Sequence, residues 1–236
     1  LVSGACFADF GHDVVCIDKD EDKIQRLREG IMPIYEPGLD DLVDKNAKAG
    51  RLSFTTDLAE GIAGAGAIFI AVGTPSRRGD GHADLSFVYA VAREIGESLT
   101  NDAVVVTKST VPVGTGDEVE RILSQGPAVT ERGLKVSVVS NPEFLAEGTA
   151  MRDLANPDRV LIGGGTDEEG RKAVEQVAGI YRNWVPEESI ITTNLWSSEL
   201  SKLTANAFLA QRISSINSIS ALCEVTGATL RPMTLR

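Results

Sequence analysis

Short, uninterrupted apolar runs that alternate with amphipathic segments constrain the fold of this chain more than any other feature. The runs cover residues 14–17, 67–72, 104–106, 136–139 and 160–162. Strands that are apolar on both faces belong to parallel sheets that helices cover on both sides. Between the runs, Asp20 is placed to cap a helix that ends near Gly30, and Asp84 precedes apolar residues at helical spacing. The sequence therefore predicts a doubly wound α/β fold with a parallel sheet and a buried strand at 14–17.

The C-terminal part of the chain has a different pattern. Residues 196–226 contain neither Gly nor Pro, and apolar residues recur there at helical spacing. This pattern predicts one helix of roughly 45 Å, which Pro232 would interrupt. We place a domain boundary here, with a sheet domain in residues 1–193 and the start of a helical domain in residues 194–236. Such a helix is typical of a connector between domains or of a contact between subunits.

Composition narrows the classes of partner. The net charge of −11 disfavours nucleic acid and anionic membranes, because both require a basic surface. No apolar run approaches the ~20 residues of a membrane span. Three widely spaced cysteines fit a reducing compartment. We therefore expect a cytoplasmic protein that binds neither nucleic acid nor membranes, and we expect no metal site.

An acidic residue follows the first predicted strand. In a dinucleotide-binding unit, a carboxylate at the position of Asp18 accepts hydrogen bonds from the adenosine ribose; alternatively, Asp18 caps the next helix. Lys23 could flank the same ribose or lie on the surface. The glycine loop of such a unit precedes the acidic residue by ~20 residues. Because residues 1–8 resemble the helix that follows this loop, we expect the loop and its strand to lie upstream of Leu1.

Three other predicted strands are each followed by a polar turn, and these turns cover residues 72–75, 108–112 and 141–148. Ligands bind at this edge of open α/β sheets. Glu143 and Glu147 flank apolar residues there, which suits proton transfer, although surface salt bridges explain them equally well. Lys202 and Asn206 share one helix face and could stabilise an oxyanion. On the residues alone, a lysine extending from an apolar helix explains Lys202 more simply.

Seven motifs in one order resemble the nucleotide-sugar dehydrogenases of the UDP-glucose/GDP-mannose dehydrogenase family. They lie at residues 34–39, 72–75, 108–112, 141–148, 156–160, 197–203 and 205–210. The resemblance extends from Leu1 to about Ala228. It implies a Rossmann-like domain that binds NAD.

The resemblance also implies roles for single residues. The adenosine ribose of NAD would contact Asp18 and Lys23. The rest of the dinucleotide would lie against Val72, Gly73, Thr74, Pro75, Ser76, Ser109, Thr110 and Val111, and Thr110 would also hold a catalytic water. The sugar nucleotide would contact Glu143, Phe144, Leu145, Ala146 and Glu147, with Glu143 as proton donor or acceptor and Glu147 also near the nicotinamide. Lys202 and Asn206 would hold the reacting oxygen.

The implied reaction is a twofold oxidation of UDP-glucose to UDP-glucuronate by a homodimer or larger homo-oligomer formed through the long helix. A related enzyme acting on GDP-mannose or a UDP-N-acetylhexosamine is the first alternative, and a non-catalytic binding remnant is the second. The family's nucleophilic cysteine lies in a glycine-rich turn. Cys6, Cys16 and Cys223 do not, so we interpret them as structural thiols and expect this segment alone to be inactive.

Overall fold

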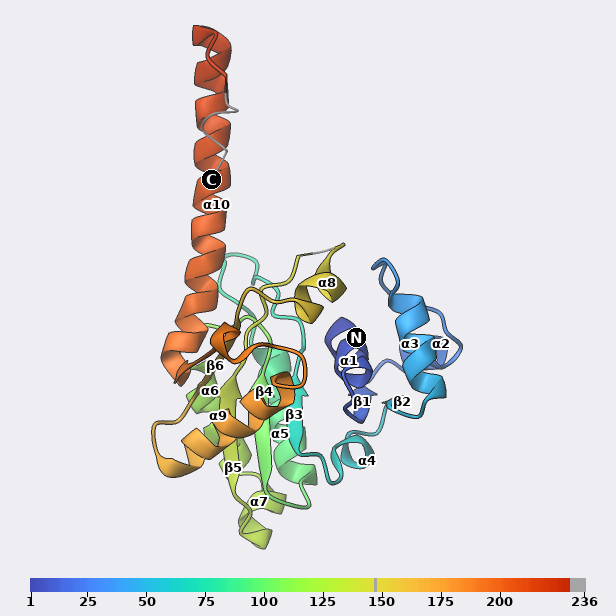
Figure 1. The fold of residues 1–236 in the computed structure, drawn as a ribbon. Helices are drawn as coiled ribbons and strands as arrows, with labels where there is room; N and C mark the ends of the chain where they lie inside the picture. The colour runs from blue at the N-terminus through green and yellow to red at the C-terminus, as the bar shows by residue number, and fades with distance from the viewer. Residues whose placement is uncertain (147, 230–236) are drawn as a thin grey trace.

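The computed structural model describes residues 1–146 and 148–229. Its helices and strands alternate along most of the chain (Figure 1). In chain order they are α1 Val2–Asp9, β1 Val14–Ile17, α2 Glu21–Arg28, α3 Leu39–Lys48, β2 Leu52–Thr55, α4 Leu58–Ile62, β3 Ala67–Ile70, α5 Ser86–Ser98, β4 Ala103–Thr107, α6 Thr115–Ser124, α7 Pro127–Arg132, β5 Val136–Ser140, α8 Ala150–Ala155, β6 Val160–Gly164, α9 Glu168–Tyr181, the 3-10 helix η1 Glu187–Ser189, β7 Ile190–Asn194 and α10 Leu195–Thr226. The predicted α/β fold is confirmed.

The main sheet has the strand order β3-β4-β5-β6-β7, and its pairs are parallel except for β5 and β6. The prediction of an entirely parallel sheet was therefore wrong for the pair β5 and β6. The helix between these two strands, α8, has only six residues and lies beyond the edge of the sheet at which β5 ends (Figure 1). Because the chain does not cross back along a face of the sheet, β6 starts at that edge and runs in the opposite direction.

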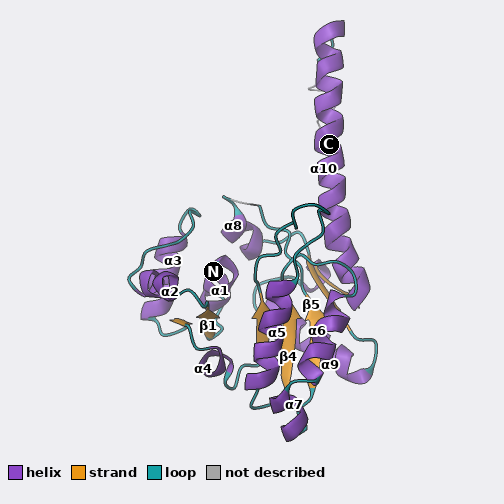
Figure 2. Cartoon of the chain, turned by 180° about the vertical axis from the view of Figure 1, so that it is seen from behind, coloured by secondary structure: helices purple, strands orange, loops and turns teal. Residues whose placement is uncertain are grey.

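Helices cover both faces of this sheet, as the apolar strands predicted. All five residues of β4 are buried, and successive side chains alternate between two cores. Val105 packs in the core beneath α5 and α6, which face the viewer in Figure 2. Val104 and Val106 pack on the other side, where α9 and Phe7 of α1 cover the sheet. The ends of the strands are thereby held in one rigid row.

The strands β1 and β2 form a separate parallel pair. Its core consists of residues from α1, α2, α3 and β2, including Ile24, Leu27 and Phe54. The prediction of a buried β1 was wrong, since Val15 is 43% exposed and Cys16 is only half-buried. Among the described residues β1 pairs with β2 alone, so no second strand shields its side chains. The predicted cap of α2 is confirmed, because the backbone N–H of Lys23 donates to Asp20.

The long helix is confirmed as α10, and it projects far beyond the sheet (Figure 1). Its first turn is held in place by buried polar contacts. Ser198 Oγ lies 3.0 Å from Ser140 Oγ, and Glu199 accepts hydrogen bonds of 2.7 Å from the backbone N–H groups of Gly114 and Gly116. Within residues 1–146 and 148–229, no helix is both long and apolar enough to cross a membrane. The break predicted at Pro232 lies outside the described residues.

Candidate functional site

The loops that follow β3 and β4 are joined to each other at the carboxyl edge of the sheet. Ser109 Oγ donates to the carbonyl oxygen of Val72 at 2.7 Å, and Thr74 Oγ1 donates to that of Thr110 at 2.9 Å. The structure thus brings together the two segments that the sequence predicted to line a dinucleotide. The side chain of Val111 is buried in the core, so it leaves only its backbone to face a ligand.

The remainder of the first loop turns away from the sheet. Ser76 forms an antiparallel bridge with Ala83, and the N–H of Asp84 donates to the carbonyl oxygen of Pro75 at 2.8 Å. These bonds close the loop just before α5 begins. Gly73 and Pro75 therefore lie in a segment that is fixed at both ends.

Asp18 lies at the carboxyl end of β1 and forms an ion pair with Lys23. Burial raises the pKa of Asp18, but hydrogen bonds from Lys23 and from the N–H of Asp20 outweigh this effect and lower it. The carboxylate stays ionised and remains 35% exposed. It can therefore still accept hydrogen bonds from a ribose, as a dinucleotide site requires. Lys23 is engaged with this carboxylate in the structure.

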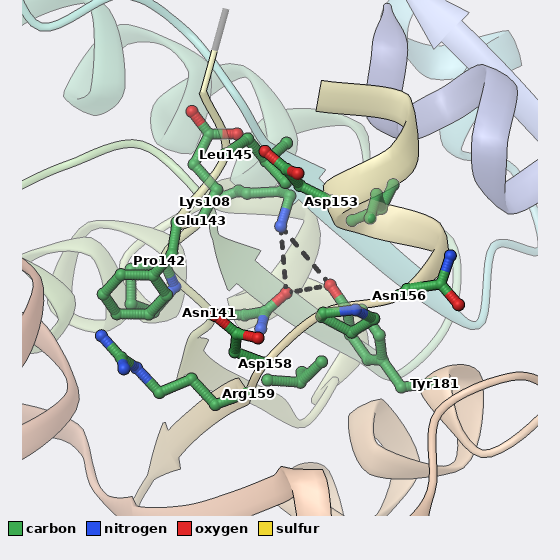
Figure 3. Close-up of a pocket in the computed structure, with 14 residues that line it drawn as sticks. Lys108, Asn141, Pro142, Glu143, Leu145, Asp153, Asn156, Asp158, Arg159 and Tyr181 are labelled. Atoms are coloured by element: carbon green, nitrogen blue, oxygen red, sulfur yellow. Dashed lines mark hydrogen bonds between the residues drawn. The ribbon is translucent and has the colours of Figure 1, made fainter. Parts of the chain in front are cut away.

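A pocket of about 360 Å³ lies beyond the ends of β4 and β5 (Figure 3). Its lining includes Lys108, Asn141, Glu143, Asp153, Arg159 and Tyr181, which come from five different parts of the chain. Phe144 and Leu145 complete the wall next to Glu143. Three of the residues predicted to contact a sugar nucleotide thus line one cavity. Ala146 lies on the same loop, where its N–H donates to Asp153 at 3.2 Å, and Glu147 lies outside the described residues.

Lys202 of α10 packs against Phe144, a residue of the pocket wall, and is not itself part of the pocket lining. Its Nζ lies 5.2 Å from the centre of the Phe144 ring, and the guanidinium carbon of Arg159 lies 4.3 Å from the same centre. Both are within range of a cation–π interaction. Burial lowers the pKa of Lys202, Glu143 opposes this change, and Arg159 adds to it. Asn206 lies one turn further along α10 and is exposed, so the structure shows no contact between it and the pocket.

Sequence reasoning missed a buried polar network at the back of the pocket. Lys108 Nζ lies 3.4 Å from both Asn141 Oδ1 and Tyr181 Oη, and the Tyr181 hydroxyl donates to Asn141 Oδ1 at 2.5 Å (Figure 3). All three residues are at most 5% exposed. The available signal was position, because Lys108 continues a fully buried strand and Asn141 follows β5 directly.

The thiols have the properties of structural cysteines. All three are free, and Cys6 and Cys223 are buried. Burial raises the pKa of Cys6 to about 11 and also raises that of Cys16. Since the thiolate is the nucleophilic form, neither thiol is activated.

The fold and the site define an open α/β protein with a pocket at the carboxyl edge of its sheet. The NAD-binding domain of the UDP-glucose/GDP-mannose dehydrogenase family matches residues 1–185, and the central domain of that family matches residues 196–233. The chain therefore belongs to the UDP-glucose/GDP-mannose dehydrogenase family.

Named relatives agree with this assignment. A UDP-glucose 6-dehydrogenase of Rhizobium meliloti is 56% identical over 98% of this chain and 52% of its own length. One from Caenorhabditis elegans is 54% identical over 92% of this chain and 46% of its own length. The chain thus spans about half the length of these relatives.

Solved structures show the same architecture. A UDP-glucose dehydrogenase from Pyrobaculum islandicum superimposes with a TM-score of 0.86 at 39% identity, covering 94% of this chain and 50% of that one. A GDP-mannose dehydrogenase from Pseudomonas aeruginosa superimposes with a TM-score of 0.88 at 32% identity, covering 98% of this chain and 52% of that one.

Proposed function

We propose that the full-length protein containing this chain oxidises UDP-glucose to UDP-glucuronate with NAD. The observation that carries the proposal is a pocket lined by Glu143 and Phe144, with Lys202 packed on the Phe144 ring, near the joined loops after β3 and β4. The names of the Rhizobium and Caenorhabditis relatives favour UDP-glucose over other nucleotide sugars.

The residues present fit a bound dinucleotide. Asp18 offers an ionised acceptor for the ribose hydroxyls, and residues 72–76 and 109–111 offer polar backbone held in place by Ser109 and Thr74. When bound, NAD supplies the hydride acceptor. Asp18 and the two loops would then orient the cofactor along the carboxyl edge, towards the pocket that contains Glu143.

The pocket side supplies the proton chemistry. Glu143 can take the proton from the sugar hydroxyl as the hydride leaves. The ammonium of Lys202 can stabilise the oxyanion that develops, and Asn206 would add a second donor from the next turn of α10. Thr110 would position the water that supplies the second carboxylate oxygen, while a second hydride leaves to NAD. Glu147 belongs to the same proposed sugar-nucleotide loop.

We further infer that the protein acts in the cytoplasm as a homo-oligomer assembled through α10. The three free cysteines support a reducing compartment. Phe208, Leu209 and Leu222 are each more than half exposed on α10, which supports a covered helix in the assembly.

The test is steady-state production of NADH by the full-length protein with UDP-glucose, GDP-mannose and a UDP-N-acetylhexosamine in parallel. We expect UDP-glucose to give the highest kcat/KM. A clear preference for GDP-mannose would contradict the substrate assignment. Nucleotide-sugar binding without turnover would instead support a binding protein.

The variant Lys202→Ala tests the roles within the site. Loss of one oxyanion donor should lower kcat by about 10²–10³-fold. The KM for NAD should change little, because Lys202 lies beside the pocket that is proposed to hold the sugar. Near-normal turnover would remove Lys202 from the proposed mechanism.

A further inference from the structure

The buried ammonium of Lys108 has no part in the function proposed above. It extends from the end of β4, whose position is fixed because the backbone N–H of Lys108 donates to the carbonyl oxygen of Ile70 at 2.9 Å. The residue is only 5% exposed, yet it lines the pocket together with Glu143. A lysine is rarely buried unless a partner compensates for the cost of removing its charge from water.

The partners of Lys108 are neutral and are themselves fixed. Asn141 Nδ2 donates to the carbonyl oxygen of Leu161 at 2.9 Å, so the Oδ1 atom of the amide must face Lys108 and Tyr181. The Tyr181 hydroxyl donates a hydrogen bond to that Oδ1 atom and accepts one from the Lys108 ammonium (Figure 3). The network therefore joins β4, the loop after β5 and α9.

We propose that Lys108 is a positioning residue for the sugar-nucleotide end of the site: through Asn141 and Tyr181 it fixes the loop that carries Glu143, and it places a positive charge behind that carboxylate. This inference rests on the proposed function. Glu143 is two residues beyond Asn141, so a shift of the amide moves the carboxylate. An error of about 1 Å in a catalytic group can cost about 10²-fold in rate.

The charged and titratable groups around Lys108 come from every side of the pocket. They are Glu143 from the loop after β5, Asp153 from α8, Asp158 and Arg159 from the segment before β6, Tyr181 from α9 and Lys202 from α10. Burial lowers the pKa of Lys108 to about 8; Glu143 opposes this change and Lys202 adds to it. Burial raises the pKa of Tyr181, so the hydroxyl keeps its proton while the lysine titrates.

The main experiment compares Lys108→Met with the parent in the full-length protein. We expect kcat to fall by about 10²-fold, with the KM for NAD unchanged. Replacement of a buried charge by an apolar side chain of similar length often leaves stability unchanged or raises it. The melting temperature should therefore not fall in parallel with activity. A loss of stability with normal kcat per folded molecule would overturn the proposal, because it would show a purely structural role.

The pH profile gives a second readout. In the parent, kcat/KM should decline as the pH rises through about 8 and the ammonium of Lys108 loses its proton. This decline should disappear in Lys108→Met and remain in the control Lys172→Met, which replaces an exposed lysine on α9, the helix of Tyr181. Tyr181→Phe should lower kcat by roughly tenfold, the value of one hydrogen bond. Tyr181→Phe with full activity and an unchanged profile would contradict the proposal even if Lys108→Met failed to fold.

A third measurement needs no turnover. Protein labelled with ¹⁵N at the lysine side chains should show one ammonium that titrates near pH 8 and is missing from Lys108→Met. If the parent shows no such ammonium, the role proposed for Lys108 is overturned, whether or not UDP-glucose is the substrate. Conversely, if the titration is present and another nucleotide sugar is oxidised, only the substrate assignment fails, and the kinetic comparison is repeated with that sugar.

Discussion

Glu199 should be worth more to the stability of this chain than any exposed carboxylate on the same helix. It is 2% exposed, and its two oxygens accept hydrogen bonds of 2.7 Å from the N–H groups of Gly114 and Gly116. These donors begin α6, where helices have unpaired N–H groups and where no other side chain forms a cap. The contact fastens the base of α10 to the start of α6.

The magnitude follows from the number of donors. Glu199→Ala leaves the buried N–H group of Gly116 and the half-buried N–H group of Gly114 without a partner, and each costs about 1–3 kcal/mol. We therefore expect the free energy of unfolding to fall by about 2–6 kcal/mol. Glu199→Gln retains one acceptor oxygen and turns an N–H₂ group towards the second donor, so it should lose about half as much.

The assay is urea unfolding of the 236-residue chain, followed by circular dichroism at neutral pH. Glu224→Ala is the matched control, because Glu224 is exposed on the same helix. The control should stay within about 0.5 kcal/mol of the parent. If Glu199→Ala also stays in that range, the two hydrogen bonds do not anchor α10 and the reasoning is refuted.

Three further predictions concern the cofactor, the packing of α9 and the response to acid. The kcat/KM of the full-length protein should be higher with NAD than with NADP, because the ionised Asp18 repels a 2′-phosphate; equal or higher efficiency with NADP would exclude this role. Gly170→Ala should destabilise by about 1–3 kcal/mol, since the new Cβ would lie 2.5 Å from the backbone of residue 165. In Gly179→Ala, on the same helix, the new Cβ meets nothing within 4 Å, so the free energy of unfolding should rise by about 0.5–1 kcal/mol. Denaturation midpoints equal to that of the parent would contradict the expectations for both variants. The hydrogen bond from Lys45 lowers the pKa of Asp9 below 3.8, so its stabilisation is present above that pH and is lost as the pH falls through the folded value. Acid titrations should therefore show a steeper loss of stability in the parent than in Asp9→Asn, and superimposable curves would rule the contribution out.

The elements that the sequence predicted well are those determined by local chemistry. The buried strand β4, the cap at Asp20 and the long helix α10 each follow from a residue pattern within one segment. The reversed direction of β6 depends on where the short α8 lies, which no local pattern encodes. The strands β2 and β7 also escaped prediction, because their sequences mix apolar and polar residues and β7 is partly exposed.

The same distinction holds for the candidate site. The loops after β3, β4 and β5 could be predicted, because parallel strands bring their carboxyl ends together. The partnership of Lys108 with Tyr181 could not, because the two residues are 73 positions apart and meet only when α9 packs on the sheet. The stacking of Arg159 and Lys202 on Phe144 likewise depends on the angle at which α10 leaves β7.

The shallow anchorage of α10 makes the geometry of the pocket sensitive to angle. The helix has 32 residues and is about 48 Å long, but of its described residues only Leu195, Ser198, Glu199 and Cys223 are buried. A tilt of about 5° at its base would displace the far end by about 4 Å and Lys202 by somewhat less than about 1 Å. That smaller shift is already on the scale at which catalytic rates fall. Contacts along the distal turns of the helix therefore have an angular tolerance of only a few degrees. Any contact that tilts the far end of α10 also moves Lys202 near its base.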